Sequence, residues 1–181
     1  MTIDTAIRTP FRTSSQTDDS RFLLHEVEVA GVARLSPSFV RITLRGPSLD
    51  RFADNGFDQR IKLFFPAADG SLDALPFSDD WYDVWRGLEE HRRPPIRTYT
   101  IRAVRAEAQE IDVDLVLHGA TGPASAWAVD CVEGDRIIVL GPNSGFDGVQ
   151  GGVDFHPPAH CERILLVGDE TALPAIANTL E

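Results

Sequence analysis

The chain has 181 residues, enough for one domain with a substantial core or for one domain and a fragment of a second. Its formal net charge of -11 argues against general nucleic-acid binding. No apolar run approaches the roughly 20 residues of a membrane-spanning helix, and the N-terminus has no apolar signal segment. Cys131 and Cys161 show no metal or cluster spacing. We therefore expect a cytoplasmic protein with reduced cysteines and no membrane insertion.

The first part of the chain predicts a tail followed by three strands. Residues 1–20 are rich in Thr, Ser, Asp and Arg and are expected to form a disordered tail. Alternation of apolar and polar residues from His25 to Val29 predicts the first strand. The second strand, SFVRITLRG, is predicted to place Val40, Ile42 and Leu44 on one face. RIKLFFP predicts a third strand that ends at its proline.

Three more strands and two short helices are predicted between residues 79 and 142. DDWYDVWRGLEEHRR places residues 81, 84, 85 and 88 on one stripe of a helix. PPIRTYTIRAVR, EIDVDLVLHG and GDRIIVLGP are the fourth, fifth and sixth strands. Pro123 fits the first position of a helix that follows Thr121 and Gly122. Six short strands with one helix before the last predict a small antiparallel barrel or sandwich over residues 21–150.

Residues 151–181 differ in kind from the rest. GGVDFHPPAH is typical of a linker, and RILLVGDETALPAIANTLE predicts an apolar strand, a Gly-Asp turn and a helix. Such a strand is usually covered on both faces within a parallel sheet, which one strand and one helix cannot form. We therefore expect residues 151–181 to be a linker and the start of an incomplete NAD(P)-binding domain.

The fourth strand carries the first candidate site, formed by Arg97, Tyr99 and Thr100. A protein wall that binds a flavin needs a flat partner for the isoalloxazine ring, a polar group near N5 and cations for the phosphates. The Arg-x-Tyr-Thr pattern offers all three from neighbouring positions. The same spacing also fits an edge strand with solvated arginines and a tyrosine in the core.

Two later turns carry complementary chemistry. TGPAS begins a helix whose free N–H groups, with the Ser125 hydroxyl, can seat a phosphate, although an ordinary capped helix has the same pattern. VGDETALP follows the apolar strand at the place where dinucleotide folds bind ligands. Because Asp169 and Glu170 would repel a pyrophosphate, a flavin or nicotinamide ring is the expected neighbour of this turn.

In this order, these motifs resemble the siderophore-interacting protein family, which contains flavin-dependent ferric-siderophore reductases of the ferredoxin-reductase-like superfamily. The resemblance extends from about residue 22 to the end of the chain. The matching residues are Arg97-Thr98-Tyr99-Thr100-Ile101-Arg102, Asp114-Leu115-Val116-Leu117-His118-Gly119, Gly122-Pro123-Ala124-Ser125 with Trp127-Ala128, Gly134-Asp135, and Gly168-Asp169-Glu170-Thr171-Ala172-Leu173-Pro174.

The resemblance implies a six-stranded antiparallel Greek-key barrel that binds FAD. It also implies that electrons from NAD(P)H or a ferredoxin pass through the flavin to Fe(III) held by a siderophore, after which Fe(II) leaves. The cofactor would carry the chemistry, so no catalytic side chain is expected. By position, the implied FAD contacts are Arg97, Tyr99 and Thr100 at the flavin, His118 and Gly119 along the ribityl–phosphate side, Ala124 and Ser125 at the pyrophosphate, and Thr171 near the ring, with Gly168, Asp169 and Glu170 on the nicotinamide side.

Basic residues near this region are candidates for substrate binding, because ferric siderophores are often anionic. Lys62 matches a basic position that the family often uses near its substrate. Arg102 belongs to an arginine-rich run, residues 91–105, that contains no acid. Lys62 and Arg102 are therefore the expected substrate contacts. His156 and His160 have two prolines between them, so no metal site is predicted there.

Two other functions fit the same sequence. One is a different flavin reductase, for instance one that serves an oxygenase. The other is a flavin-binding module without NAD(P)H activity, since the family continues into a full nucleotide-binding domain and this chain stops at its first helix. The siderophore, the choice among NADH, NADPH and ferredoxin, and the oligomeric state are left open by the sequence.

Overall fold

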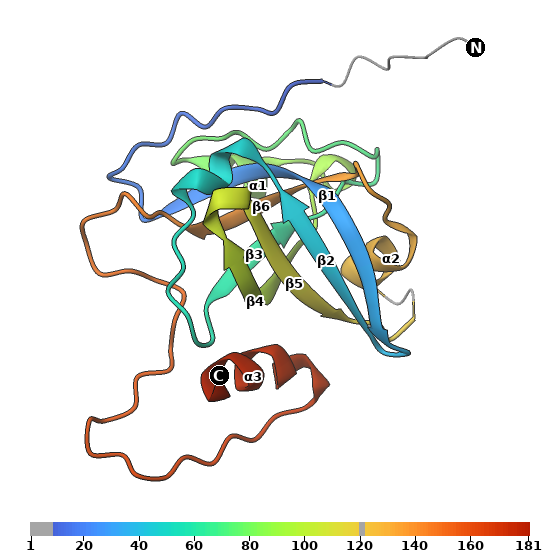
Figure 1. Ribbon diagram of the computed structural model, residues 1–181. Helices are drawn as coiled ribbons and strands as arrows, with labels where there is room; N and C mark the ends of the chain where they lie inside the picture. Colours follow the sequence, from blue (N-terminus) through green and yellow to red (C-terminus); the bar gives the residue numbers. More distant parts are fainter. Residues whose placement is uncertain (1–8, 120–121) are drawn as a thin grey trace.

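Six antiparallel strands close into a barrel in the computed structural model, which describes residues 9–119 and 122–181 (Figure 1). The order around the barrel is β1-β2-β5-β4-β3-β6, and β6 pairs back with β1. The predicted six-stranded antiparallel barrel is thus confirmed. The strands are β1 (Phe22–Ser36), β2 (Phe39–Arg45), β3 (Arg60–Phe64), β4 (Ile96–Arg105), β5 (Glu110–Val116) and β6 (Arg136–Pro142).

Among the described residues, three α-helices and four short 3-10 turns accompany the barrel. Helix α2 begins at Pro123, as predicted, while Thr121 lies outside the described residues. Within the part of the chain that the structure describes, no helix has the length and apolar character needed to cross a membrane. The helices are α1 (Trp81–Gly87), α2 (Pro123–Asp130) and α3 (Leu173–Leu180), and the turns are η1 (Pro47–Arg51), η2 (Glu90–Arg92), η3 (Ala106–Ala108) and η4 (Glu170–Ala172).

The barrel interior is filled by the apolar faces that alternation predicted. From β2, Val40, Ile42 and Leu44 are all buried in one cluster. The buried side chains of β5 that join this cluster are Ile111, Val113 and Leu115. Since successive side chains of a strand point to opposite faces, the residues between them point outward. The polar outer face of β4 and β5 is where the candidate site lies.

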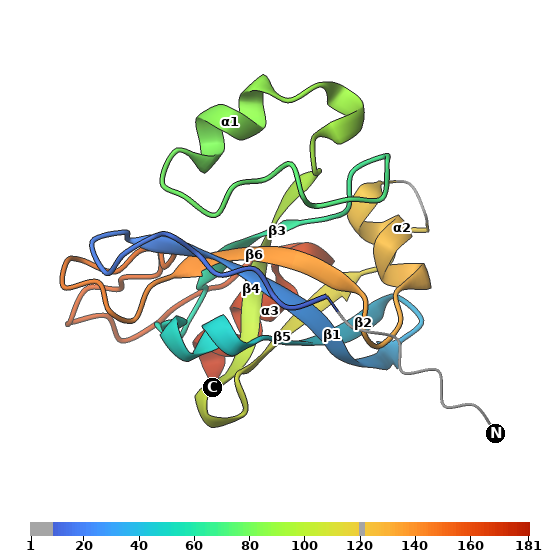
Figure 2. The same ribbon diagram turned by 90° about the horizontal axis from the view of Figure 1, so that it is seen from above.

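The long connection between β3 and β4 lies over the outside of the barrel (Figure 2). A second core packs beneath it. Phe64 and Ile138 belong to it, and Trp81 and Trp85 of α1 pack against them. The prediction that Trp81 and Trp85 share one face of a helix is therefore confirmed. Val84, predicted to lie on the same face, is 37% exposed. Burial of the aromatic pair holds the connection against the barrel wall.

The N-terminal segment, residues 9–20, differs from the disordered tail that composition suggested. Gln16 is buried, its amide donates to the Phe22 carbonyl, and its oxygen accepts from the Leu24 N–H (2.8 Å). The Ser15 N–H and hydroxyl both donate to the Phe77 carbonyl. Polar side chains here satisfy backbone groups of β1 and of the connection between β3 and β4. Residues 1–8 of the expected tail lie outside the described residues.

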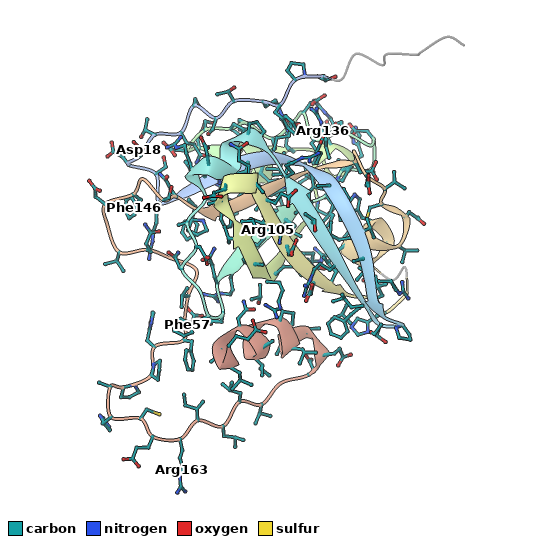
Figure 3. The ribbon with its side chains drawn as sticks, in the orientation of Figure 1. Asp18, Phe57, Arg105, Arg136, Phe146 and Arg163 are labelled. Carbon is teal, nitrogen blue, oxygen red and sulfur yellow. The ribbon has the colours of Figure 1, made fainter. Side chains whose placement is uncertain are left out.

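Of the two elements predicted in the C-terminal segment, the helix is present as α3 and the strand is absent. Residues 163–168 form no strand, and Leu165 and Val167 are 86% and 83% exposed. A strand is stabilised by hydrogen bonds to a neighbour, and none of the described strands pairs with this segment. Arg163 lies at the outer edge of this loop, away from the barrel (Figure 3). The assignment of residues 151–181 to a second domain stays a prediction.

On the outer face of β5, Asp112 forms polar contacts with the neighbouring strands β2 and β4. It accepts from the Thr43 hydroxyl at 2.8 Å and from both terminal nitrogens of Arg105, which lies over β4 and β5 (Figure 3). Burial alone would raise the pKa of Asp112, but the hydrogen bonds from Arg105 and Thr43 lower it.

We expect Thr43→Val to lower the free energy of unfolding by about 1 kcal/mol, because one hydrogen bond to a nearly buried carboxylate is lost while the β-branched shape is kept. Urea unfolding measures this difference. Thr43→Ser, which retains the hydroxyl, is the matched control and should lie closer to the wild type. A valine variant as stable as the wild type would show that this hydrogen bond contributes nothing.

Candidate functional site

A cavity of about 300 Å3 lies on the outside of the barrel, against β4 and β5. The first turn of α2 and the η4–α3 segment contribute its other walls. Helix α3 is held beside β4 by the Asn178 amide, which donates to the Ile101 carbonyl at 2.6 Å. The cavity is lined by Arg60, Arg97, Thr98, Tyr99, Thr100, Asp114, Val116, His118, Ser125, Thr171 and Pro174.

Six of the predicted FAD contacts line this one cavity, although they come from four separate segments of the chain. They are Arg97, Tyr99, Thr100, His118, Ser125 and Thr171. Of the other two, Ala124 is buried next to Ser125, and Gly119 is exposed beside His118. Gly119 has φ +77°, a left-handed conformation that favours glycine at the turn leaving β5.

Tyr99 and Arg97 present different chemistry from the same strand. Tyr99 packs part of its ring against the barrel core, and burial raises the pKa of its phenol, against a smaller opposing effect of Arg97. The phenol therefore stays protonated at neutral pH and can donate a hydrogen bond. Arg97 is exposed, and the hydrogen bond of its guanidinium within the described residues goes to the carbonyl of Ile96. It is available to bind an anion.

The start of α2 faces the same cavity with free donors. Gly122, the N-cap residue, has no side chain to cap the helix, and Pro123 has no N–H. The N–H groups of Ala124 and Ser125 are then the first that the helix leaves without an intrahelical partner. With the Ser125 hydroxyl and the guanidinium of Arg97 lining the same cavity, this arrangement suits a phosphate group.

The η4 turn is shaped by its own acidic residue. Asp169 accepts from the Thr171 hydroxyl (2.6 Å) and from the Thr171 N–H (2.9 Å), and these hydrogen bonds lower the pKa of Asp169. Glu170 lies 3.7 Å from the His118 ring. Thus the carboxylates of the turn are engaged locally, while Thr171 itself lines the cavity. Gly168 does not line it, so the nicotinamide-side role of residues 168–170 stays a prediction.

Five lining residues were not among the predicted contacts: Arg60, Thr98, Asp114, Val116 and Pro174. Asp114 accepts two hydrogen bonds from Arg41, at 2.7 and 2.8 Å, so its charge is compensated within the protein wall. The signal that could have found Thr98 and Asp114 is alternation. Asp114 alternates with the buried Val113 and Leu115 of β5, and Thr98 of β4 has the parity opposite to Tyr99 and Ile101, which pack in the core. The two strands are paired.

The two predicted substrate contacts lie in different places. Lys62 lines a second cavity of about 360 Å3, which shares Arg60 and Thr98 with the first, and its ammonium lies 3.3 Å from the Thr98 hydroxyl. Arg102 lines neither of these cavities. Its guanidinium is held by both carboxylate oxygens of Glu181, at 2.5 and 3.1 Å. The structure therefore does not bring Arg102 together with Lys62.

The residues present fit a flavin dinucleotide. One cavity combines an aromatic ring, outward hydroxyls, an available cation and a helix N-terminus, which together match a ring system joined to a pyrophosphate. A closed antiparallel barrel that carries such a cavity on its outer wall defines the class of flavin-binding barrels. Comparison with known proteins identifies the family within this class.

Residues 28–146 match the model of the siderophore-interacting FAD-binding domain, and the chain belongs to this family. FAD is therefore its cofactor. It is 34% identical over 164 residues to the NADPH-dependent ferric-chelate reductase of Escherichia coli, covering 91% of this chain and 58% of that protein. It is 33% identical over 147 residues to the ferric vibriobactin reductase ViuB of Vibrio cholerae, covering 81% and 49%.

A solved structure supports the same assignment. The siderophore-interacting protein SipS from Aeromonas hydrophila superimposes with a TM-score of 0.64 at 32% identity, over 88% of this chain and 54% of that one. This chain spans about half the length of the curated relatives that it matches. The resemblance to the siderophore-interacting family that the motifs indicated is confirmed.

Proposed function

We propose that this chain is the FAD-holding part of a ferric-siderophore reductase that acts in the cytoplasm with electrons from NAD(P)H or a ferredoxin. The observation that carries the proposal is the gathering of Arg97, Tyr99, Ser125 and Thr171 around one outer cavity, next to a second cavity with Lys62. Relatives named as ferric reductases, matched over most of this chain, support it. FAD, when bound, supplies the conversion between two-electron donors and one-electron acceptors such as Fe(III).

The side chains of the site then have binding and positioning roles. Arg97 binds phosphate oxygens, together with the N–H groups and hydroxyl at the start of α2. Tyr99 offers a flat apolar surface to the ring, and its protonated phenol donates a hydrogen bond. The Thr100 hydroxyl lies one position further along β4 and can bond to the polar edge of the ring. None of these groups has to move a proton for electron transfer to Fe(III).

The Lys62 cavity is the proposed place for the siderophore. It lies directly beside the flavin cavity, because Arg60 and Thr98 line both. Arg60 is paired with Asp154 at 2.8 Å, which leaves Lys62 as the cation of this cavity without an acidic partner among the described residues. A cation there favours an anionic ferric chelate over a neutral one.

Stepwise electron transfer tests the proposal. The protein is reconstituted with FAD and reduced anaerobically with dithionite, excess reductant is removed, and a ferric siderophore or free flavin is added as acceptor. Fe(II) trapped by a coloured chelator, with reoxidation of the bound FAD, is the expected result. Protein that stays colourless after incubation with FAD would overturn the proposal, and so would reduced protein that passes electrons to free flavin but never to ferric siderophores.

A second candidate is a flavin-binding module without NAD(P)H activity, because residues 163–168, the predicted first strand of an NAD(P)-binding domain, form no strand. In the same anaerobic assay, NADH, NADPH or a reduced ferredoxin replaces dithionite as the reductant. Bleaching by one of them identifies the donor. Protein that is reduced only by dithionite, and then reduces the siderophore, supports the second candidate.

Lys62→Ala is expected to raise the KM for an anionic ferric siderophore by about 3-fold and to leave kcat nearly unchanged, because an exposed charge contributes modestly to capture. Steady-state rates of Fe(II) formation at low ionic strength measure KM and kcat separately. Lys62→Arg, which keeps the charge, is the control. An alanine variant with the KM of the wild type at every salt concentration would contradict a substrate role for Lys62.

A further inference from the structure

Among the described residues, Asp114 is the one acidic side chain that lines the flavin cavity. Its side chain is 9% exposed, so the carboxylate is largely removed from water. Burial of a charge is costly, and a carboxylate in the wall of a cavity that receives phosphates also repels them. Phosphate binding therefore does not account for Asp114, which points to a role toward another part of the cofactor.

Asp114 lies beside Thr100 in the cavity wall, at a distance from Arg97. Strand β5 pairs with β4 at Val113 and Ile101. Asp114 and Thr100 are the next residues beyond this pair, and both have the outward parity, because the paired residues pack in the core. At about 3.3 Å per residue, Thr100 stands roughly 10 Å along β4 from Arg97. With the phosphates at Arg97, the carboxylate of Asp114 is on the side of the ring.

The cations that compensate Asp114 lie outside the cavity. Arg41 of β2 donates to one oxygen from Nε at 2.7 Å and to the other from Nη2 at 2.8 Å, and this bonding raises the pKa of Arg41. Two parallel bonds from a guanidinium are the geometry of an ionised carboxylate. Arg102, with Nε 3.9 Å from Oδ2 of Asp114, is held more closely by Glu181. Since neither arginine lines the cavity, the carboxylate is nearer to a bound ring than either cation, and its field there is only partly cancelled.

Asp112, two positions earlier on β5, forms a similar ion pair away from the cavity. It accepts from both terminal nitrogens of Arg105 and is as buried as Asp114, at 6% against 8% exposed. It does not line the flavin cavity. An ion pair of this kind therefore joins neighbouring strands without needing a ligand. Asp114 and Arg41 join β5 to β2 in the same way, so what distinguishes Asp114 is its place in the cavity wall.

A fixed charge beside a flavin acts on the charge that the ring gains on reduction. Two electrons and one proton convert the neutral oxidised ring into a monoanion, and two Fe(III) ions then accept one electron each. Resting on the proposed ferric-siderophore reductase function, we propose that the Asp114 carboxylate lowers the reduction potential of bound FAD, with Arg41 as its positioning residue. The negative charge disfavours the monoanion, so the protein makes FAD a stronger reductant. Because hard oxygen ligands stabilise Fe(III), a lower flavin potential increases the driving force for reducing such chelates.

The test measures the reduction potential of FAD in the loaded protein by anaerobic equilibration with redox dyes at pH 8. In Asp114→Asn, the affinity for reduced FAD relative to oxidised FAD is expected to rise about 10-fold, which raises the potential of this two-electron couple by about 30 mV. Arg41→Gln removes the cation and leaves the carboxylate, so the potential should shift by a similar amount in the opposite direction. Asp114→Glu keeps the charge and should restore most of the wild-type potential. Asp112→Asn, which breaks the ion pair outside the cavity, is the matched control and should change the affinity ratio by less than about 2-fold.

The sign of the shift separates a charge effect from a loss of packing, because only a charge effect reverses between Asp114→Asn and Arg41→Gln. An unchanged potential in Asp114→Asn, a shift of the same sign in both variants, or an equal shift in Asp112→Asn overturns the role of Asp114. If Asp114→Asn does not load FAD, Arg41→Gln decides the question, since its side chain lies outside the cavity. Protein that shows the expected potentials and never reduces a ferric siderophore contradicts the proposed function and leaves the role of Asp114 in place.

Discussion

Arg97→Ala is expected to weaken FAD binding about 30-fold, which corresponds to about 2 kcal/mol. The reason is that Arg97 lines the flavin cavity, with its guanidinium available for the phosphates. A charged hydrogen-bond donor to a phosphate is among the stronger polar contacts that a site can offer. Titration of the apoprotein with FAD, followed by quenching of flavin fluorescence, measures the loss.

The stability of the protein should not change in this variant, because Arg97 is exposed and its guanidinium bonds only to the neighbouring Ile96 carbonyl within the described structure. Arg97→Lys keeps a charge but not the two-pronged geometry, so its FAD affinity should lie between those of the alanine variant and the wild type. Unchanged FAD affinity in Arg97→Ala, with a normal unfolding midpoint, would remove Arg97 from the site.

Acidification from pH 6.5 to pH 4 is expected to lower the free energy of unfolding by up to about 3 kcal/mol through one residue, His25. The side chain is buried between β1 and η1, where its Nδ1 lies 3.2 Å from the Ser48 hydroxyl and its ring packs on Phe52. Burial lowers the pKa of His25 to about 4, with a smaller contribution from the charge of Arg51.

The direction of the effect follows from proton uptake. In the unfolded chain His25 has an ordinary pKa near 6.5, so below that pH the unfolded state binds a proton that the folded state does not. Stability is therefore full above about pH 6.5 and falls as the pH approaches 4. Carboxylates with a lowered pKa, such as Asp112, act in the same direction but below this window, since they become protonated only under more acidic conditions.

Urea unfolding at several pH values isolates the contribution of His25. His25→Gln, which can still bond to Ser48, is expected to show a shallower loss between pH 6.5 and 4.5 than the wild type. His156→Gln, which removes an exposed histidine instead of a buried one, is the matched control. A His25→Gln variant with the wild-type slope would mean that other groups cause the acid sensitivity.

Local pattern was enough to predict the six strands of the barrel, the α2 helix and the family. Alternation along β2 and β5 identified the residues that fill the barrel, since a strand with one buried face must repeat every two residues. Pro123 marked the start of α2 because proline lacks the N–H that the first turn leaves unpaired. The motifs of β4, α2 and η4 carried the family resemblance, and the family model that matches residues 28–146 confirms it.

Only the tertiary structure decided which of these residues meet. Strand order, β1-β2-β5-β4-β3-β6, depends on pairing between distant segments, and it places Asp114 beside the outward hydroxyls of β4. The same packing holds Arg102 at Glu181 rather than beside Lys62, a partnership of residues 79 positions apart. It also leaves residues 163–168 without a strand partner despite their apolar sequence. Hydrophobic periodicity sets the inward face of each strand locally, whereas the composition of a cavity on the outer face depends on contacts between segments that are far apart in the chain.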